Sequence, residues 1–478
     1  MSLQEGQTHP GLSRSLRWLL PILAIFIVLS VCYHYAVPLF EAPDEPSHIE
    51  YLAFLHQEGR LPRHEASPDV PGEGIQPPLY YLMAWPSFAT LSSDGSDLYR
   101  SLHRVNLHLY GYGRSRALDL AQPLILFRIP GGRLSRPRVF EEHPHLSWLL
   151  GLRWMSLFFG VLAVAVTFFA AIRITESLPV SFLTAGLLGF NPQFLFVCNY
   201  VNNDSAAAAL GAMAFYLVAT SLTQQAGHPA RRHYLLLGLL LAAGFLLKKT
   251  TIPGLAVAAL TLISCDSRPI RRRLADAGSM ICLALLLAAP YLYWNLRVHG
   301  DPFGIGVEQA ANALLPSPDQ YGGLWPYFSK VYFSWTFESY WAWFGWMNLQ
   351  VPQAAYWVFF VLTCTGILGF ILQARARQAT SQPQVLVGRS LQVYLLGAIL
   401  STLAAHVWFN VHVVQPQGRH LFPVAPQIAF LLAVGLASIG GRGATSRVRA
   451  GSIGLSLLIL VGLASYCLVG VILPAYRA

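Results

Sequence analysis

Long apolar segments recur from one end of the chain to the other, separated by polar stretches. Apolar positions run continuously in each segment and do not alternate with polar ones, as they would in the strands of a membrane barrel. A helix needs roughly 20 apolar residues to cross a bilayer, and only helices and closed barrels can cross it. The pattern predicts an all-α polytopic membrane protein with about 11 transmembrane helices, at residues 16–37, 147–172, 178–201, 205–222, 234–247, 252–265, 274–294, 354–372, 391–409, 421–439 and 453–473.

The arginines indicate which side of the membrane each loop faces. Arg14 and Arg17 precede the first apolar segment, and short loops rich in arginine or lysine stay in the cytoplasm. Residues 1–15 are therefore expected to be a cytoplasmic tail, and residues 16–478 a single transmembrane domain whose C-terminus lies outside. The first segment is expected to remain as an anchor, because no small-residue cleavage site follows it. By the same rule, several other loops lie on the cytoplasmic side. They contain Arg173, Arg231, Arg268, Arg271, Arg272, Arg273, Arg375, Arg377, Arg389, Arg442, Arg447 and Arg449.

Two long polar stretches are expected outside the membrane. Residues 38–147 contain an aromatic segment at residues 74–91, which is too short to span and better suits an interfacial helix. Residues 295–350 follow the seventh span and are rich in aromatic side chains. Such rings stack well on sugars, but a belt at the membrane surface is the more frequent reason for them.

The composition agrees with a membrane protein. Of the 478 residues, 54% are hydrophobic and only 11% are charged. A net charge of +10 would indicate nucleic-acid binding in a soluble protein, but here the arginines lie in short loops, and no nucleic-acid partner is expected. The six cysteines lie in or beside apolar segments without paired spacing, so neither a disulfide framework nor a zinc site is expected.

The charged stretch after the first span is the strongest candidate for chemistry. Asp44 and Glu45 are framed by Pro43 and Pro46, and Pro46 can occupy the first turn of a helix that one of the acids caps. Helical spacing would put His48 on the same face as both acids. A solvated acidic turn is the alternative, but a tight group of two acids and a histidine is unusual in a chain with so few charges.

The spacing of Glu45 and His48 also occurs in carboxylate metal sites. One such pair supplies too few ligands, and a hydrogen bond between His48 and an acid is favoured over a metal. Residues 142–145 hold a glutamate and two histidines, but Pro144 breaks the helical geometry there. No metal ligands are assigned, and a divalent metal stays open as a cofactor.

Other polar residues without a topological reason fall on the outer side of the membrane. Lys248 and Lys249 end a short hairpin on that side, against the rule for positive charges. Ionisable groups at membrane depth are costly and usually pair or serve function. Acids and bases gathered on one side indicate a site that removes a proton and stabilises an anionic leaving group. The further candidates are Gln76, Tyr80, Asp204, Arg297, Gln417, Arg419 and His420.

These features together resemble the GT-C superfamily of membrane glycosyltransferases, which take sugars from polyprenyl-phosphate carriers. The matching features are the acid pair Asp44-Glu45 after the first span and the Pro-Pro-Leu-Tyr-Tyr run at residues 77–81. Gly-Phe-Leu-Leu-Lys at residues 244–248 and the order of the many spans also match. The resemblance covers nearly the whole chain.

The chain is similar to one bacterial branch of this superfamily. That branch has Pro-x-Asp-Glu-x-x-His after the first span, Asn-Asn-Asp after the third, and Gln-Gly-Arg before a late span. These motifs stand here at residues 43–48, 202–204 and 417–419. The branch usually has tyrosine where this chain has His420.

The resemblance implies roles for the acids and their neighbours. Asp44 would be the general base that accepts the acceptor's proton, and Glu45 would orient Asp44 or a substrate hydroxyl. Capping of the helix is the structural alternative for Asp44. Residues expected to bind substrate or support the site are His48, Gln76, Tyr80, Asp204, Gln417 and His420, although Asn-Asn-Asp equally suits an ordinary helix start.

The cations are expected to hold the lipid phosphate of the donor. The resemblance assigns Lys248 and Lys249 to this role, whereas snorkelling to headgroups would suit one lysine better than two. Arg419 could bind phosphate through two parallel hydrogen bonds, and the missing side chain of Gly418 would let the phosphate approach closely. Arg297 is a weaker candidate of the same kind.

The expected function is transfer of a sugar from a polyprenyl-phosphate-linked donor to a hydroxyl-bearing acceptor, with inversion of configuration. The acceptor would be an envelope glycan, lipid or protein at the outer face of the bacterial cytoplasmic membrane, and the enzyme would contact membrane lipids. A lipid-linked sugar transporter or flippase should carry polar groups through the middle of the membrane. An oligosaccharide polymerase would lack the early acid pair. Apolar spans with polar groups on one side favour the transferase.

Overall fold

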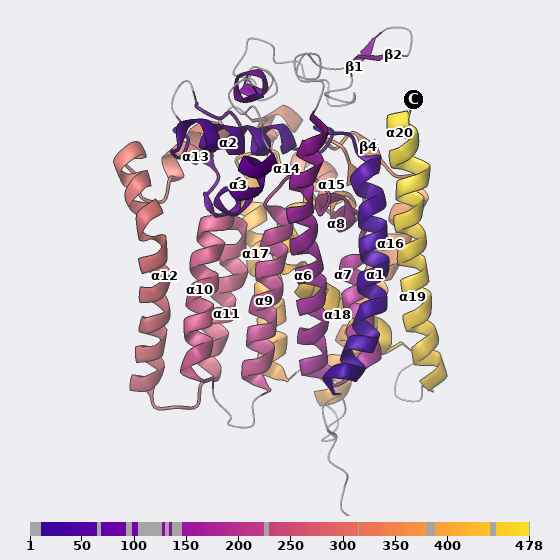
Figure 1. Cartoon of the computed structure of the whole chain (residues 1–478). Helices are drawn as coiled ribbons and strands as arrows, with labels where there is room; N and C mark the ends of the chain where they lie inside the picture. Colours follow the sequence, from indigo (N-terminus) through magenta and orange to yellow (C-terminus); the bar gives the residue numbers. More distant parts are fainter. Residues whose placement is uncertain are drawn as a thin grey trace, which may run out of the picture.

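The computed structural model describes residues 11–64, 68–91, 98–103, 127–129, 133–135, 146–223, 229–313, 315–378, 388–439 and 446–477. These residues are mostly helical. Long helices stand side by side as a bundle, and shorter helices lie across one end of it (Figure 1). The predicted helical membrane architecture is confirmed.

Eight helical segments in the described part of the chain are long and apolar enough to cross a membrane. Shorter helices run beside them, so the number of 11 spans stays a prediction (Figure 1). The long segments contain α1 (Leu12–Ala36), η2 with α6 (Leu146–Leu149, Leu150–Thr175), α9 (Asp204–Leu222), α12 (Ile270–His299), α16 (Gln353–Gln378), α17 (Arg389–Asn410), η6 with α18 (Gly418–Val424, Ala425–Ala437), and α19, η7 and α20 (Ser446–Tyr466, Cys467–Ile472, Leu473–Arg477). The shorter helices of the bundle are α7 (Leu178–Gly189), α10 (Arg231–Leu247) and α11 (Ile252–Cys265).

The prediction of one continuous helix at residues 178–201 is wrong. α7 ends at Gly189, and a separate short helix, α8 (Pro192–Val197), follows it. The side-chain oxygen of Asn191 accepts hydrogen bonds from two backbone N–H groups in the first turn of α8. Pro192 has no N–H to donate to the preceding turn, so the two residues together stop one helix and start the next.

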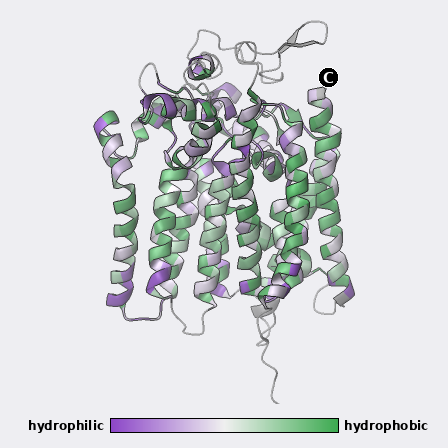
Figure 2. Cartoon of the chain, viewed as in Figure 1, coloured by the Kyte–Doolittle hydropathy of each residue, from purple (hydrophilic) through white to green (hydrophobic). Residues whose placement is uncertain are grey.

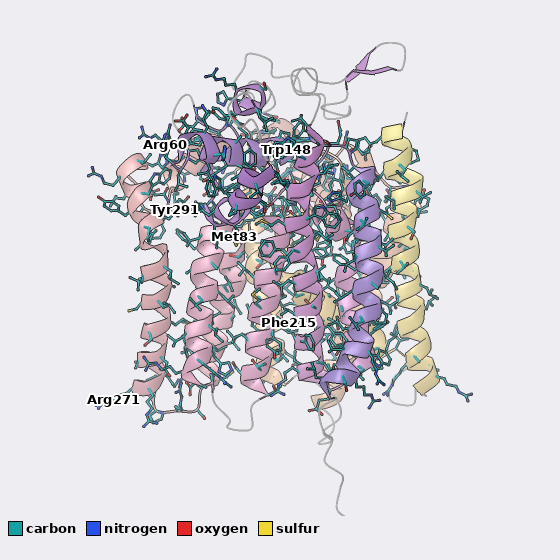
Figure 3. All side chains as sticks on the ribbon, in the orientation of Figure 1. Arg60, Met83, Trp148, Phe215, Arg271 and Tyr291 are labelled. Carbon is teal, nitrogen blue, oxygen red and sulfur yellow. The ribbon has the colours of Figure 1, made fainter. Side chains whose placement is uncertain are left out.

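Hydropathy and charge change along the height of the bundle. Hydrophobic residues cover the middle of the helices, and hydrophilic residues concentrate at both ends (Figure 2). Phe215 lies near mid-height, whereas Arg271 and Arg60 lie towards opposite ends (Figure 3). α1 begins at the end that holds Arg271 and α20 finishes at the other, so the chain crosses the bundle an odd number of times.

The layer across the end of the bundle comes from the two stretches predicted as long outer loops. The segment 38–147 contributes α2 (Glu45–Glu58), η1 (Glu73–Ile75) and α3 (Leu79–Leu91), together with an antiparallel ribbon of β1 (Phe127–Ile129) and β2 (Arg133–Ser135). The segment 295–350 contributes α13 (Ile305–Asn312), η4 (Pro318–Tyr321), α14 (Leu324–Tyr327), η5 (Phe328–Tyr332), α15 (Phe333–Trp341), and an antiparallel ribbon of β3 (Trp343–Phe344) and β4 (Leu349–Gln350).

Helix α3 is the helix predicted within residues 74–91. Tyr81 is buried on one side of it, whereas Leu82 is 54% exposed and Trp85 is 41% exposed. An apolar side chain left exposed beside a membrane-spanning bundle suits a helix at the interface. The rings of Tyr51 and Tyr81 stack with centroids 3.6 Å apart, which joins α3 to α2 and gives the outer layer a packed core.

Glycines bring several helices of the bundle close together. A Cβ at Gly435 on α18 would overlap the carbonyl of Gly366 on α16, and a Cβ at Gly211 on α9 would overlap the backbone of Pro423 in η6. Small residues are common where membrane helices approach closely. The second contact fixes the end of η6, the short helix that carries Arg419.

Candidate active site

A cavity of about 310 Å³ lies between the outer layer and the end of the bundle. Its walls come from α2, η1, η3 (Lys249–Thr251), α13, α17, η6 and the residues next to them. The wall is mixed, with charged and polar groups on one part and apolar groups on another. The polar lining residues include Asp44, His48, Glu73, Gln76, Lys248, Lys249, Glu308, Gln415, Arg419 and His420.

Asp44 precedes α2 but does not cap it through its side chain. Its backbone has φ 63° and ψ −5°, in the left-handed region that few residues other than glycine adopt. No hydrogen bond joins its carboxylate to the first turn of α2. The carboxylate instead accepts a hydrogen bond from Arg419 Nη2, and 18% of the side chain is exposed. Strained backbone of this kind often occurs at functional sites.

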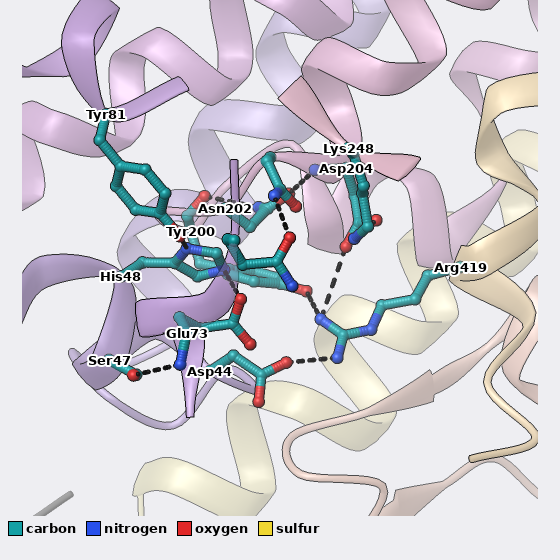
Figure 4. A network of polar contacts seen from close by, with 12 residues as sticks. Asp44, Ser47, His48, Glu73, Tyr81, Tyr200, Asn202, Asp204, Lys248 and Arg419 are labelled. Atoms are coloured by element: carbon teal, nitrogen blue, oxygen red, sulfur yellow. Dashed lines mark hydrogen bonds and ion pairs between the residues drawn. The ribbon is translucent and has the colours of Figure 1, made fainter. Parts of the chain in front are cut away.

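Arg419 connects three parts of the chain (Figure 4). Besides Asp44, its guanidinium donates to the hydroxyl of Tyr200 at 3.1 Å and lies 3.5 Å from a carboxylate oxygen of Asp204. Its Nε donates to the side-chain oxygen of Gln417 at 2.6 Å. Gln417 therefore holds the guanidinium in place.

The two neighbouring lysines contact different acids. Lys248 donates to Asp204 at 2.5 Å in a nearly buried pair, and Lys249 donates to Glu308 of α13 at 2.5 Å. The side chain of Lys249 is 31% exposed and that of Glu308 is 37% exposed. Both ammonium groups and Arg419 line one cavity, so an anionic ligand there would find three cations whose present partners are carboxylates.

His48 lines the cavity but pairs with neither acid that the sequence suggested. Its Nδ1 lies 2.8 Å from the hydroxyl of Tyr81, and its Nε2 lies 3.9 Å from a carboxylate oxygen of Glu73. Burial lowers the pKa of His48 to about 3, which outweighs the opposing effect of the Asp44 charge. The imidazole is therefore neutral at physiological pH. The prediction that His48 shares one helix face with both acids is wrong, because the side chain of Glu45 points away from the cavity.

Glu45 lies outside the cavity and forms a buried ion pair with Arg153 of α6. Two nitrogens of the guanidinium each donate to one carboxylate oxygen at 2.7 Å, and neither side chain is exposed. Arg153 also donates to backbone carbonyls near the end of α1, among them that of Val37 at 2.7 Å. The carboxylate of Glu45 is therefore committed to joining α2, α1 and α6. The sequence predicts Glu45 beside the reacting groups, and the structure corrects this, because Glu45 lies in the core against Arg153.

The remaining predicted residues divide into those at the cavity and those away from it. Gln76 lines it and accepts a hydrogen bond from Asn203 at 3.2 Å, and His420 lines it as well. Tyr80 is buried, with its hydroxyl 3.3 Å from that of Ser156, and does not line the cavity. Arg297 is exposed on α12 and does not line it either.

Gly418 does not leave room for a ligand. A Cβ there would overlap the backbone of Tyr340 and Thr336 on α15. The expectation that this glycine opens a path to a phosphate is therefore wrong. Its missing side chain lets η6 pack directly on α15, and its N–H donates to the hydroxyl of Ser339 at 2.8 Å.

Comparisons with known proteins agree with this architecture. Residues 147–294, less than half of the chain, match the family PMT_2, described as dolichyl-phosphate-mannose-protein mannosyltransferase. A sequence search of curated proteins found no match. The oligosaccharyltransferase of Archaeoglobus fulgidus, solved with a tethered acceptor peptide, is similar in structure with a TM-score of 0.52 and 12% identity over 94% of this chain. The fold is GT-C-like.

The structural matches differ from this chain in length. The chain spans 55% of the archaeal oligosaccharyltransferase. A second match is ArnT from Cupriavidus metallidurans, solved bound to undecaprenyl phosphate. The match covers 96% of this chain and 73% of ArnT, with 13% identity and a TM-score of 0.49. The structural match to the archaeal oligosaccharyltransferase extends over nearly the whole of this chain.

The structure singles out two residues that sequence reasoning missed, one at the cavity and one in the core beside it. Glu73 lines the cavity beside Asp44, and Arg153 anchors Glu45. An arginine inside an apolar span must find a partner, and this signal could have identified Arg153. Glu73 stands in an ordinary polar loop, and no pattern there distinguishes it. Among the described residues no group of three or more His, Cys, Asp or Glu side chains could hold a metal ion, so no metal ligands are assigned.

Proposed function

We propose that this protein is a glycosyltransferase that moves a sugar from a polyprenyl-phosphate carrier to a hydroxyl acceptor. One observation carries the proposal: three cations and the carboxylate of Asp44 converge on a single cavity at one end of a membrane bundle. Cations can hold a departing phosphate, and a carboxylate beside them can accept a proton. The partial match to a mannosyltransferase family supports the same reaction class.

The donor phosphate would bind Arg419 and Lys248, with Lys249 at the more exposed edge. A guanidinium can hold two phosphate oxygens at once, whereas the ammonium groups act as point charges. The phosphate would replace Asp44 and Asp204 as the partner of these cations. Charge then develops on the phosphate as the bond to the sugar breaks, and the cations stabilise it.

Asp44 would act as the general base. The acceptor oxygen attacks the anomeric carbon, the bond from that carbon to the phosphate oxygen breaks, and the hydroxyl proton passes to the Asp44 carboxylate. The products are the new glycoside and the polyprenyl phosphate. Attack in line with the departing phosphate would invert the configuration at the anomeric carbon.

The apolar part of the cavity wall suits the lipid portion of the donor. Ala405 and Phe409 on α17 and Leu315 after α13 line it, and Trp408 next to them is 67% exposed. These apolar side chains could contact a lipid chain that leaves the cavity on this side. Arg271 lies towards the opposite end of the bundle (Figure 3), so the positive-inside rule supports a cavity that faces outwards from the bacterial cytoplasmic membrane.

Mass spectrometry of envelope glycans from a deletion strain tests the proposal. We expect one sugar residue to be missing, and a gene for the wild-type protein to restore it where the Asp44→Asn variant does not. An unchanged set of glycans would contradict the transferase. For a flippase or polymerase without this acid-base chemistry, Asp44→Asn would restore the glycan.

A further inference from the structure

Glu73 is a nearly buried carboxyl on the cavity wall, with 14% of its side chain exposed. His48 Nε2 lies 3.9 Å from a carboxylate oxygen of Glu73, and that imidazole is neutral. No cation in the described part of the chain forms an ion pair with Glu73. Arg419 contacts Asp44 and Asp204, Lys248 contacts Asp204, and Lys249 contacts Glu308.

The charges that line the cavity, together with Asp204, which pairs with two of the lining cations, already balance without Glu73. Three cations stand against three carboxylates, and an ionised Glu73 would leave one negative charge in excess. A buried carboxyl beside another carboxylate, without a cation of its own, keeps its proton more strongly than one in water. The charged groups counted are Arg419, Lys248 and Lys249 against Asp44, Asp204 and Glu308, and the other titratable groups nearby are His48, Tyr81, Tyr200, His406 and His420.

We propose that Glu73 holds a proton until the donor binds, and that this neutral carboxyl allows the cavity to accept an anionic phosphate. The inference rests on the proposed function for the identity of the anion. Figure 4 shows Glu73 and Asp44 on the same side of the Arg419 guanidinium. The acid pair of the site is therefore Asp44 with Glu73, and Glu45 has no part in it. Glu73 is a positioning residue that sets the charge of the phosphate site.

The electrostatics of the site agree with this role. Burial, and after it the charge of Asp44, raises the pKa of Glu73 to about 8. A bound phosphate adds a further negative charge and raises that pKa again. Binding of the anion is then strongest below pH 8, where Glu73 is protonated. It weakens as the pH rises from about 8 towards the higher pKa of the bound state.

The first experiment measures the affinity of the full-length protein in detergent for undecaprenyl phosphate between pH 7 and pH 9. For the wild type we expect a loss of about fivefold for one pKa unit of coupling, rising to about tenfold where the pKa of the bound state lies well above 9. Glu73→Gln copies the neutral carboxyl and should bind well at both pH values. Glu58→Gln, an exposed acid on α2, is the matched control and should behave as the wild type. A Glu73→Gln variant that cannot bind at pH 7, or that repeats the wild-type pH dependence, would overturn the inference.

The second experiment observes the proton itself by infrared spectroscopy of the same purified proteins. The carbonyl stretch of a protonated carboxylic acid should be present at pH 7, disappear as the pH rises through about 8, and be missing in Glu73→Gln. If this band behaves as expected but no polyprenyl phosphate binds at any pH, the donor class in the proposed function is wrong, and with it the role of Glu73 in admitting that donor. A wild type without the band would overturn the inference even where the lipid binds normally.

Discussion

Arg419 and Asp44 form an ion pair at the cavity although 375 positions separate them along the chain. The same guanidinium reaches Asp204 at 3.5 Å. A phosphate at Arg419 would compete with Asp44 for these donors. Donor binding would therefore release the Asp44 carboxylate, which we propose as the general base. Binding of the donor phosphate would in this way prepare the site to accept the acceptor's proton.

Asp44→Asn should abolish most of the turnover while the protein still inserts and purifies normally. Asparagine tolerates the left-handed backbone at this position but cannot accept the acceptor's proton. Loss of a general base typically lowers rates about 10²–10⁴-fold. Initial rates of sugar transfer by purified protein check this result, and an active Asp44→Asn enzyme would contradict the assignment of the base.

Removal of the cations should weaken use of the donor more than use of the acceptor. Each lost charge-assisted hydrogen bond to an ion is typically worth about 1.5–3 kcal/mol, so Arg419→Ala and Lys248→Ala should raise the KM for the donor strongly. Lys249→Ala should have a smaller effect, because its ammonium group is more exposed to water. The exposed Lys330→Ala on η5 is the control. Unchanged donor KM in all three variants would remove these residues from the phosphate site.

Glu45→Gln should lower stability and leave the chemistry of the folded fraction largely intact. It leaves the buried Arg153 without its carboxylate, and breaking a buried ion pair typically costs about 3–5 kcal/mol. Thermal unfolding of the purified variant measures the loss. Glu58→Gln should unfold as the wild type does. A Glu45→Gln protein with normal stability but no activity per folded molecule would mean that Glu45 takes part in the reaction after all.

Gly418→Ala should damage the donor site through the backbone. The added Cβ would overlap α15, so η6 must move and carry Arg419 with it. We expect a lower unfolding temperature together with a higher KM for the donor. Gly462→Ala on α19, where a Cβ would meet nothing within 4 Å, should be neutral or slightly stabilising. Equal behaviour of the two variants would show that η6 tolerates the shift.

The topology gives a prediction that needs no substrate. Reporter fusions should place the loop after α1 outside the cytoplasm and the turn between α11 and α12, which holds Arg268, inside. A reporter within residues 38–147 that is active in the cytoplasm would contradict both the orientation and the site that depends on it.

The amino-acid sequence by itself determined the class of the fold. Continuous apolar segments allow only spanning helices in lipid, and arginines in short loops orient them, because both effects act locally along the chain. The sequence also identified Asp44, Lys248 and Arg419 as candidates, since charges beside apolar segments are costly and need a reason. The break between α7 and α8 also has a local signal in Asn191 and Pro192, which the predicted span at residues 178–201 overlooked.

Only the tertiary structure decided how the charges pair. Glu45 follows Asp44 directly, yet one contacts Arg153 in the core and the other contacts Arg419 at the cavity, since the left-handed backbone of Asp44 directs the two side chains apart. Glu73 becomes part of the site only when η1 folds over α2. Ion pairs between distant segments depend on how whole helices pack, and no spacing along the chain encodes that distance.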